Sequence, residues 1–215
     1  MKIYFTSVQA CKRRVKYETM LGLKQAKTKY KDRGFIITNY HGSNEIEHLR
    51  YFLGSAHLHI CAANEHIGDI ERYVWEIKEQ VRFGCHSIPY KKFTKLMMRS
   101  FVQDMITCLN MFPSKNGISS NLSPSSSILG SSNPGYNKMR ITFGACAQVY
   151  IRTNKSTKKR RVGAIALISE NEHGGCYFMP LSNGKHLHGL IWTELPINYQ
   201  VVYRLNYLAI KENQP

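Results

Sequence analysis

The sequence predicts a mixed α/β protein. We expect an α/β domain over residues 1–113, a Ser/Gly/Pro-rich linker over 114–136, and a small all-β, barrel-like domain over 137–215 that ends in a helix. In the first part, short apolar runs alternate with amphipathic segments, which is typical of strands alternating with helices in a parallel sheet. From Met139 onward apolar side chains recur with a period of two, which indicates short strands. This change of periodicity across the linker divides the chain into two domains.

The first domain is expected to begin with a strand over Lys2–Ser7, where apolar and polar residues alternate. A helix over 17–31 follows, and Gly34 stands where a left-handed residue would end it. The next expected elements are a strand over 35–38, a helix over 45–53 closed by Gly54, and a strand over 58–61.

The stretch from Ala62 to Arg82 predicts an amphipathic helix. Its apolar residues recur at steps of three and four and form a stripe that can be buried against a sheet: Ile67, Ile70, Val74, Ile77 and Val81. Glu71, Lys78 and Arg82 share another face, where a carboxylate beside two cations can be a metal ligand next to a phosphate backbone. A solvated charged face with an ordinary ion pair is the alternative interpretation.

A second long helix is expected over 93–112, and Pro113 ends it. Its Met and Phe side chains at helical spacing are interpreted as core. The residues on its inner side are Phe93, Leu96, Met97, Phe101, Met105, Cys108, Leu109 and Phe112. Within the linker, residues 125–129 predict one short helical turn.

After the linker, five short strands are expected, over residues 140–144, 148–152, 162–168, 176–181 and 185–192. Ser182-Asn183-Gly184 is a hairpin signal between the last two. This pattern fits a small antiparallel barrel or sandwich. A helix over 199–210 closes the chain, and its inward-facing residues are Val202, Leu205, Leu208 and Ala209.

The charge balance points to a polyanionic partner. Thirty Lys and Arg against fourteen Asp and Glu give a formal net charge of +16, and such an excess repels itself in a compact chain unless a polyanion neutralises it. DNA or RNA is the leading candidate. A membrane is not expected, because the chain has neither a basic amphipathic segment with a broad apolar face nor an apolar run of about 18 residues.

Five of seven residues between two expected strands are basic: Lys155, Lys158, Lys159, Arg160 and Arg161. Such a run is usually a solvated loop. It is also the composition that contacts a phosphate backbone. Both interpretations remain open on the residues alone.

The six cysteines form no Cys-x-x-Cys pair and no regular framework, so we expect reduced thiols. The N-terminus does not have the apolar region of a signal peptide, and a cytoplasmic or nuclear location is expected. His57/His59 and His186/His188 are each spaced by two, which places both members of a pair on one face of a strand and does not favour a zinc site.

The segment from Asn64 to Tyr73 (Asn-Glu-His-Ile-Gly-Asp-Ile-Glu-Arg-Tyr), followed by Ile-Lys-Glu-Gln-Val-Arg at 77–82, resembles the last catalytic segment of copia-type retrotransposon integrases. Further matches occur in the family's order at residues 30–35, 45–47, 87–92, 109–113, 122–124 and 163–167. The resemblance covers most of the chain. It implies a ribonuclease-H-like fold for the first domain and an origin as a polyprotein fragment of a transposable element.

The resemblance also implies a metal site. The family joins DNA by phosphoryl transfer with two Mg²⁺ or Mn²⁺ ions held by two aspartates and a glutamate. Glu71 stands at the position of the glutamate, as catalytic residue and metal ligand, whereas Ser43 stands at the position of the middle aspartate. The residues before Ser43 contain one aspartate, Asp32, which belongs to the 30–35 match. The implied domain therefore lacks its first strands, and its degenerate site is not expected to hold the ions productively.

Two functions remain open. The first is an inactive remnant of the DNA-integration family that binds DNA without sequence preference through Arg72, Lys78, Arg82 and residues 155–161. The second is a non-enzymatic basic module that binds RNA or a protein. A nuclease that uses Glu45, Glu47, Asp69 and Glu71 is less favoured, because residues two apart on a helix face apart. The missing strands would leave an unpaired edge at Lys2–Ser7, which predicts self-association through that edge.

Overall fold

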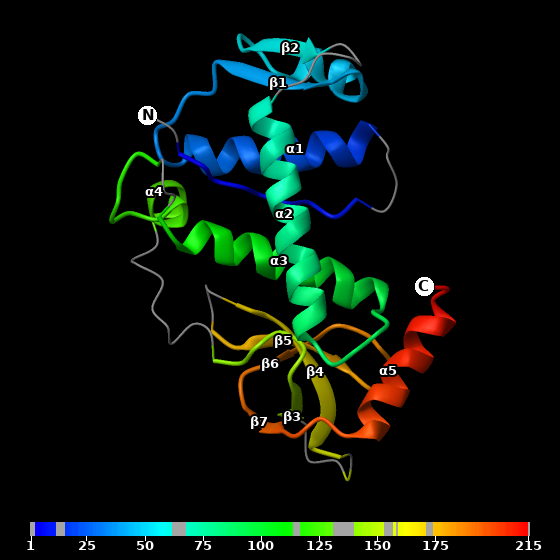
Figure 1. The fold of residues 1–215 in the computed structure, drawn as a ribbon. Helices are drawn as coiled ribbons and strands as arrows, with labels where there is room; N and C mark the ends of the chain where they lie inside the picture. Colours follow the sequence, from blue (N-terminus) through cyan, green and yellow to red (C-terminus); the bar gives the residue numbers. More distant parts are fainter. Residues whose placement is uncertain are drawn as a thin grey trace. The chain divides into compact units, whose positions relative to one another are not determined.

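The computed structural model of the chain describes residues 3–11, 16–61, 68–113, 117–130, 140–152, 157, 159–170 and 174–214. The protein is a mixed α/β structure with two compact units (Figure 1). Unit 1 comprises Met1–Lys78 and Leu109–Asn133, and unit 2 comprises Glu79–Cys108 and Pro134–Pro215. The domain boundaries predicted from the change of periodicity stay a prediction. Within the described ranges, no helix has the length and apolar character needed to cross a membrane.

The strand predicted over Lys2–Ser7 is not formed by its described residues, 3–7. The buried Asn110 side chain takes the place of a neighbouring strand there. Its Oδ1 accepts a hydrogen bond from the Thr6 N–H at 2.9 Å, and its Nδ2 donates to the Thr6 carbonyl at 2.6 Å. Because one amide satisfies both backbone groups of Thr6, this segment needs no β ladder at that point. The strand edge on which the expected self-association depends is therefore not formed by residues 3–7.

Helix α1 (Lys16–Lys31) confirms the first predicted helix, and Gly34 adopts the left-handed conformation with φ +76°. The strand predicted over 35–38 is not formed, because the turn at the end of α1 holds its first residue, Phe35. The Phe35 N–H donates to the Tyr30 carbonyl, and the Phe35 ring packs edge-on against the Tyr30 ring. These contacts hold Phe35 to the helix end, while the Ile36 side chain is 88% exposed.

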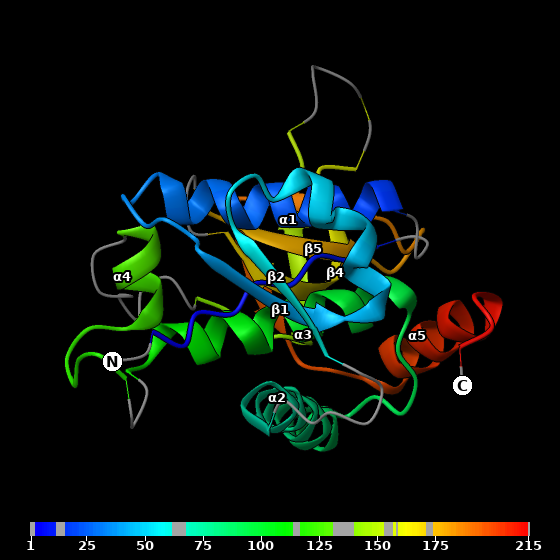
Figure 2. The same cartoon turned by 90° about the horizontal axis from the view of Figure 1, so that it is seen from above.

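The sheet of unit 1 lies one step further along the chain. Strands β1 (Asn39–Ser43) and β2 (His57–Cys61) pair in parallel, and Figure 2 shows them side by side. The 3₁₀ helix η1 (Asn44–Phe52) connects them. A Cβ at Gly42 would meet the end of the Ile46 side chain, so glycine lets η1 fold closely against β1 without moving that side chain. The helix predicted over 45–53 is thus helical in a tighter form. Strand β2 matches its prediction.

Helix α4 (Pro124–Leu129) confirms the predicted helical turn. The Ser123 side chain caps it by accepting the Ser126 N–H at 3.0 Å. At its other end, Arg33 Nη2 donates to the Leu129 carbonyl at 2.6 Å, which satisfies one of the carbonyls that a helix end leaves without a partner.

Two long helices, α2 (Gly68–Ser87) and α3 (Lys95–Met111), confirm the other helical predictions. The predicted burial of the α2 stripe is wrong at Ile70 and Val74, whose side chains are 44% and 43% exposed, while Ile77 and Val81 are half-buried. Ile67 lies outside the described residues. Strand β1 is mostly polar, and the apolar residues of β2 are Leu58, Ile60 and Cys61, so the two strands offer little apolar surface to cover Ile70 and Val74.

Helix α3 contributes core residues, as predicted. Thr94 caps it by accepting the Met97 N–H at 3.2 Å, and the Met97 and Phe101 side chains are fully buried. The prediction is wrong at Phe112, which follows the last helical residue and is 58% exposed.

Unit 2 contains the five-stranded antiparallel sheet, in the order β6-β5-β4-β3-β7. Its strands are β3 (Cys146–Tyr150), β4 (Arg161–Ser169), β5 (Cys176–Pro180), β6 (Leu187–Gly189) and β7 (Trp192–Leu195). The hairpin at Ser182-Asn183-Gly184 is confirmed between β5 and β6, with Gly184 at φ +67°. The antiparallel sheet is as predicted, but the strand predicted over 185–192 is divided into β6 and β7.

The strand predicted over 140–144 is absent as well, and the strand predicted over 148–152 begins at Cys146. Ile141 and Phe143 are buried, which explains the alternating pattern. The backbone instead turns at Gly144, where φ is +83° and the N–H donates to the Ala166 carbonyl.

The sheet is strongly curled. A Cβ at Gly189 on β6 would lie 2.5 Å from a Val149 methyl on β3, although β5 and β4 separate these strands in the sheet order. Only glycine permits this approach. Both faces of the sheet carry buried side chains. One face bears Ala147, Val149, Ala164, Ala166 and Phe178, and part of the other packs under α3 and α5.

Helix α5 (Tyr199–Lys211) confirms the C-terminal helix and lies along the sheet of unit 2 (Figure 1). Asn198 caps it by accepting the Val201 N–H at 3.0 Å. Leu205, Leu208 and Ala209 are buried as predicted, whereas Val202 is half-buried.

Candidate functional site

The two residues of the implied metal site lie on separate elements of unit 1. Ser43 is the last residue of β1 and pairs with Cys61, while Glu71 is exposed in the first turn of α2. Among the described residues, no group of three or more His, Cys, Asp or Glu side chains could hold a metal ion. Two hard divalent ions need several oxygen ligands, so one carboxylate and a serine do not fit the pair.

The cations predicted on α2 are in different situations. Arg72 lies 3.9 Å from Glu76, and Arg82 pairs with Glu79 one turn earlier. Exposed pairs of this kind contribute about 0.3–0.5 kcal/mol. Lys78 is exposed and has no ion pair in the described part of the chain. Arg72 and Arg82 thus have ion-pair partners on the helix itself, as the alternative interpretation expects, and their contact with nucleic acid stays a prediction.

The basic run meets an aromatic and an amide on the sheet of unit 2. Arg161 is the first residue of β4 and stands directly opposite Tyr150 on β3. Its Nη1 lies 3.4 Å from Gln148 Oε1, and Gln148 is in turn opposite Thr193 on β7. Directly opposed residues share a face, and so do residues two apart on one strand. We call these four side chains the β3–β4–β7 surface.

The β3–β4–β7 surface is open and positive. Tyr150 is 39% exposed, and Arg161 and Thr193 are exposed as well. The nearby carboxylate Glu194 pairs with Ala147 and so points to the opposite face. Within the residues that the structure describes, neither Arg161 nor the exposed Lys159 and Arg160 just before it forms an ion pair. The surface can therefore offer free positive charge, an aromatic ring and hydrogen-bonding groups together.

Two of the predicted cations, Lys155 and Lys158, lie outside the described residues. The charge of the whole unit is nevertheless fixed by the sequence. Unit 2 contains sixteen Lys and Arg against six Asp and Glu, an excess of +10. A long-range positive potential of this size attracts polyanions before any contact forms.

The paired histidines have local structural partners. His41 and His59 stack across β1 and β2 with ring centroids 4.9 Å apart. In unit 2, His188 Nε2 lies 2.7 Å from Glu170 Oε2, and the Tyr177 hydroxyl lies 3.2 Å from the other oxygen of the same carboxylate. One histidine of each pair, His59 and His188, thus has a local structural contact.

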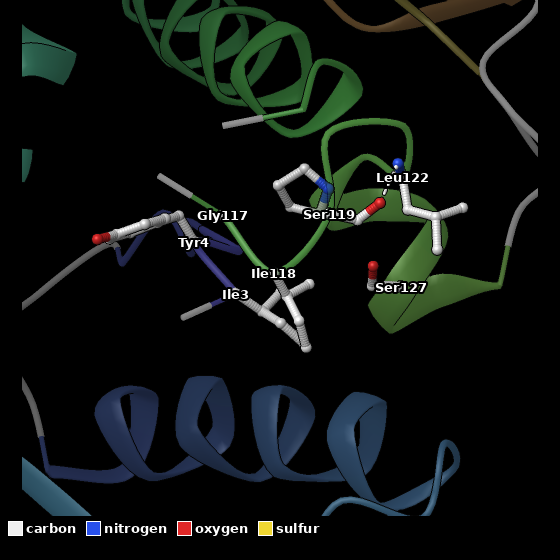
Figure 3. Close-up of a pocket in the computed structure, with 8 residues that line it drawn as sticks. Ile3, Tyr4, Gly117, Ile118, Ser119, Leu122 and Ser127 are labelled. Carbon is white, nitrogen blue, oxygen red and sulfur yellow. Dashed lines mark hydrogen bonds between the residues drawn. The ribbon is translucent and has the colours of Figure 1, made fainter. Parts of the chain in front are cut away.

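A small hollow in unit 1 does not qualify as a ligand site. It is lined by Ile3, Tyr4, Gly117, Ile118, Ser119, Leu122, Pro124 and Ser127, as Figure 3 shows. Its volume of about 10 Å³ is close to the lower limit for one water molecule. The Ser119 hydroxyl is already engaged, because it accepts the Leu122 N–H at 3.0 Å.

Sequence analysis identified Arg161 but not Tyr150, Gln148 or Thr193. The alternation of Gln148, Tyr150 and Arg152 in a predicted strand was the available signal. It places Gln148 and Tyr150 on one face, but the partner of each residue depends on strand register, which a single sequence does not specify.

All six cysteines are free thiols, as expected from their spacing. No model of a known protein family matches the chain, and no curated protein matches it.

Proposed function

We propose that the chain is a nucleic-acid-binding protein derived from a copia-type retrotransposon integrase, and that it lacks strand-transfer activity. The proposal rests on the β3–β4–β7 surface, where Arg161, Tyr150 and Gln148 lie together and no carboxylate of the described residues forms an ion pair with the arginine. A guanidinium can hold a phosphate, and an aromatic ring can stack on an exposed base. A site of action in the cytoplasm or nucleus belongs to this proposal.

The fold of each unit is compatible with this origin. In unit 1, two parallel strands joined by a helix precede the helix that carries Glu71, which is the order that the resemblance implies for a reduced ribonuclease-H-like core. In unit 2, the curl of the five-stranded sheet supports the barrel-like C-terminal domain.

The proposed loss of strand-transfer activity follows from the shortage of metal ligands. Mg²⁺ or Mn²⁺ would supply the charge that stabilises the attacking and leaving oxygens in the family. Glu71 with Ser43 does not form a donor set for such a pair, so no catalytic step is assigned to this chain.

Salt-dependent binding tests the proposal. A fluorescently labelled duplex DNA should bind the full chain, and log K should fall linearly with log salt. Replacing Lys159, Arg160 and Arg161 by Gln should reduce the magnitude of that slope by about 2 to 3, because each lost phosphate contact changes it by roughly 0.9.

A matched control carries the same charge change elsewhere. Lys24, Lys27 and Lys31 are exposed on α1, and their triple Gln variant should leave the slope nearly unchanged. The proposal fails if the native chain does not bind DNA at low salt, or if both triple variants lower the slope equally. Binding of single-stranded RNA at least about 10-fold tighter than DNA would favour the alternative, an RNA-binding module.

A further inference from the structure

The exposed side of α5 carries an apolar ridge that lies apart from the β3–β4–β7 surface. Its members follow one another at steps of four, four and three residues: Tyr199, Tyr203, Tyr207 and Ile210. In the same order their side chains are 94%, 75%, 49% and 57% exposed. At 3.6 residues per turn these positions fall within an arc of about 80°. We call them the tyrosine ridge.

The ridge makes α5 apolar on two opposite sides. The inner side is already buried through Val201, Leu205, Leu208 and Ala209. A helix that is apolar on both sides is normally covered on both. Clustered exposed tyrosines are typical of protein interfaces, because each ring offers a large contact area while few rotatable bonds become fixed.

Positive charge borders the ridge. The Arg204 guanidinium lies 5.2 Å from the centre of the Tyr207 ring and donates to the carbonyls of Leu181 and Ser182 at 2.7 and 2.8 Å. Those acceptors are neutral, so they hold the side chain without cancelling its charge. Lys211 lies on the same helix and is exposed. In the described part of the chain neither cation forms an ion pair.

These observations distinguish the candidate occupants. A second copy of the chain would bring the same cations together from two molecules that each carry +16. Nucleic acid would use flat rings, but Ile210 in the ridge offers no face for stacking. The steps of four, four and three are the spacing by which one helix packs its side chains against another helix.

We propose that α5 docks an amphipathic helix of a partner protein, with the apolar side of that helix on the tyrosine ridge and its Asp and Glu residues beside Arg204 and Lys211. The interaction is independent of the nucleic-acid surface.

A pair of synthetic peptides tests the proposal. Each is a helix of about 20 residues with a Leu stripe, long enough to fold on contact, flanked by Glu in one peptide and by Lys in the other. With the full chain, fluorescence anisotropy should show saturable binding of the Glu peptide and at least about 10-fold weaker binding of the Lys peptide.

Two variants locate the binding. The double variant Tyr203→Ser, Tyr207→Ser should bind the Glu peptide at least about 10-fold more weakly, because central aromatic residues contribute most of the binding energy of an interface. Tyr17→Ser with Tyr51→Ser removes two exposed tyrosines from unit 1 and should change nothing. Tyr199→Ser alone should also weaken binding. Because the Tyr199 side chain is 94% exposed, this loss would not come from misfolding. The ridge variant should retain DNA binding and its salt slope, so this test and that of the proposed function can fail separately.

Several results would overturn the docking proposal. Equal binding of both peptides would show that flanking charge does not matter. Equal loss in the ridge and control variants would show that the ridge is not the site. If the ridge variant loses binding of single-stranded oligothymidine but still binds the Glu peptide, the ridge is a nucleic-acid-binding site. If the native chain is a dimer and the ridge variant is a monomer, the tyrosine ridge binds a second copy of the chain.

Discussion

The two units differ in how much apolar surface they bury. Of the 24 buried hydrophobic residues in the described ranges, four belong to unit 1 and twenty to unit 2. Strand β1 and helix α1 of unit 1 have no buried residue, and strand β2 has one. The sheet of unit 2 carries buried side chains on both faces. Since burial is the main favourable term in folding, unit 2 should supply most of the stability.

This difference also separates the residues of the implied metal site from those of the β3–β4–β7 surface. Glu71 and Ser43, which carry the resemblance to a catalytic site, belong to the weakly packed unit. The β3–β4–β7 surface stands on the well-packed unit, where rigid strands hold its side chains. We infer that the proposed nucleic-acid binding depends on unit 2 and does not need Ser43 or Glu71.

Truncating the centre of the unit 2 core should have the largest effect. Phe101 is 1% exposed, and its ring centroid lies 4.7 Å from that of Phe143. Phe101→Ala should lower the free energy of unfolding by about 3–5 kcal/mol, through lost burial and the cavity left behind. Denaturant titration measures it. Phe83→Ala, at a side chain that is 75% exposed, is the control and should change stability by less than about 0.5 kcal/mol. Similar losses for both would contradict the assignment of the core.

A buried carboxyl should give the next largest effect. Burial raises the pKa of Asp104 from 3.8 to about 6, so the folded state favours the protonated acid. Stability from this group is full below pH 3.8 and is lost as the pH rises through about 6. Asp104→Asn should therefore stabilise the protein by about 2–3 kcal/mol at pH 8 and by little at pH 4.

Denaturant titrations at the two pH values measure this difference. Glu194→Gln, at an exposed carboxylate of the same unit, should change stability by less than about 0.5 kcal/mol at both. A stabilisation by Asp104→Asn that is equal at pH 4 and pH 8 would show that the carboxyl does not titrate as described.

A smaller effect is expected in unit 1. Asn110→Ala removes both hydrogen bonds to Thr6 and should cost about 1–2 kcal/mol of local stability. Hydrogen exchange at the Thr6 amide should become faster, while amides of β4 remain protected. Asn121→Ala, at an exposed residue of the same unit, is the control. If β4 amides lose protection to the same degree as Thr6, the two units do not differ in local stability.

The smallest effect is expected at Glu71. A DNA-joining assay with Mg²⁺ or Mn²⁺ should give no product with the native chain, and Glu71→Gln should be indistinguishable from it. DNA binding should also be unchanged in this variant, because Glu71 is not part of the β3–β4–β7 surface. Joining by the native chain that Glu71→Gln abolishes would show an active metal site.

Local sequence signals predicted the helices and turns well. Gly34 marks the end of α1 and Ser182-Asn183-Gly184 marks the hairpin, because these features depend on interactions within a few residues. The periodicity of two predicted an antiparallel sheet in unit 2 for the same reason.

The wrong predictions concern segments whose structure depends on residues far away in the sequence. Strand β1 is a polar segment that becomes a strand through pairing with β2, whereas the more apolar 35–38 is held by the end of α1. Thr6 finds its partner in Asn110, and the strand predicted over 185–192 divides at the curl around Gly189. The Tyr150–Arg161 pair likewise depends on register, so the sequence predicted a cation of the site but not its companions.

The most direct test of the central claim is to locate bound DNA on the full chain by amide NMR. Adding a short duplex at low salt should shift the signals of residues 148–152, 159–163 and 193, and leave β1, η1 and β2 unchanged. The shifts should disappear as salt is raised, because phosphate contacts are exchanged for ions. Shifts confined to unit 1, or spread over it through Ser43 and Glu71, would contradict the account.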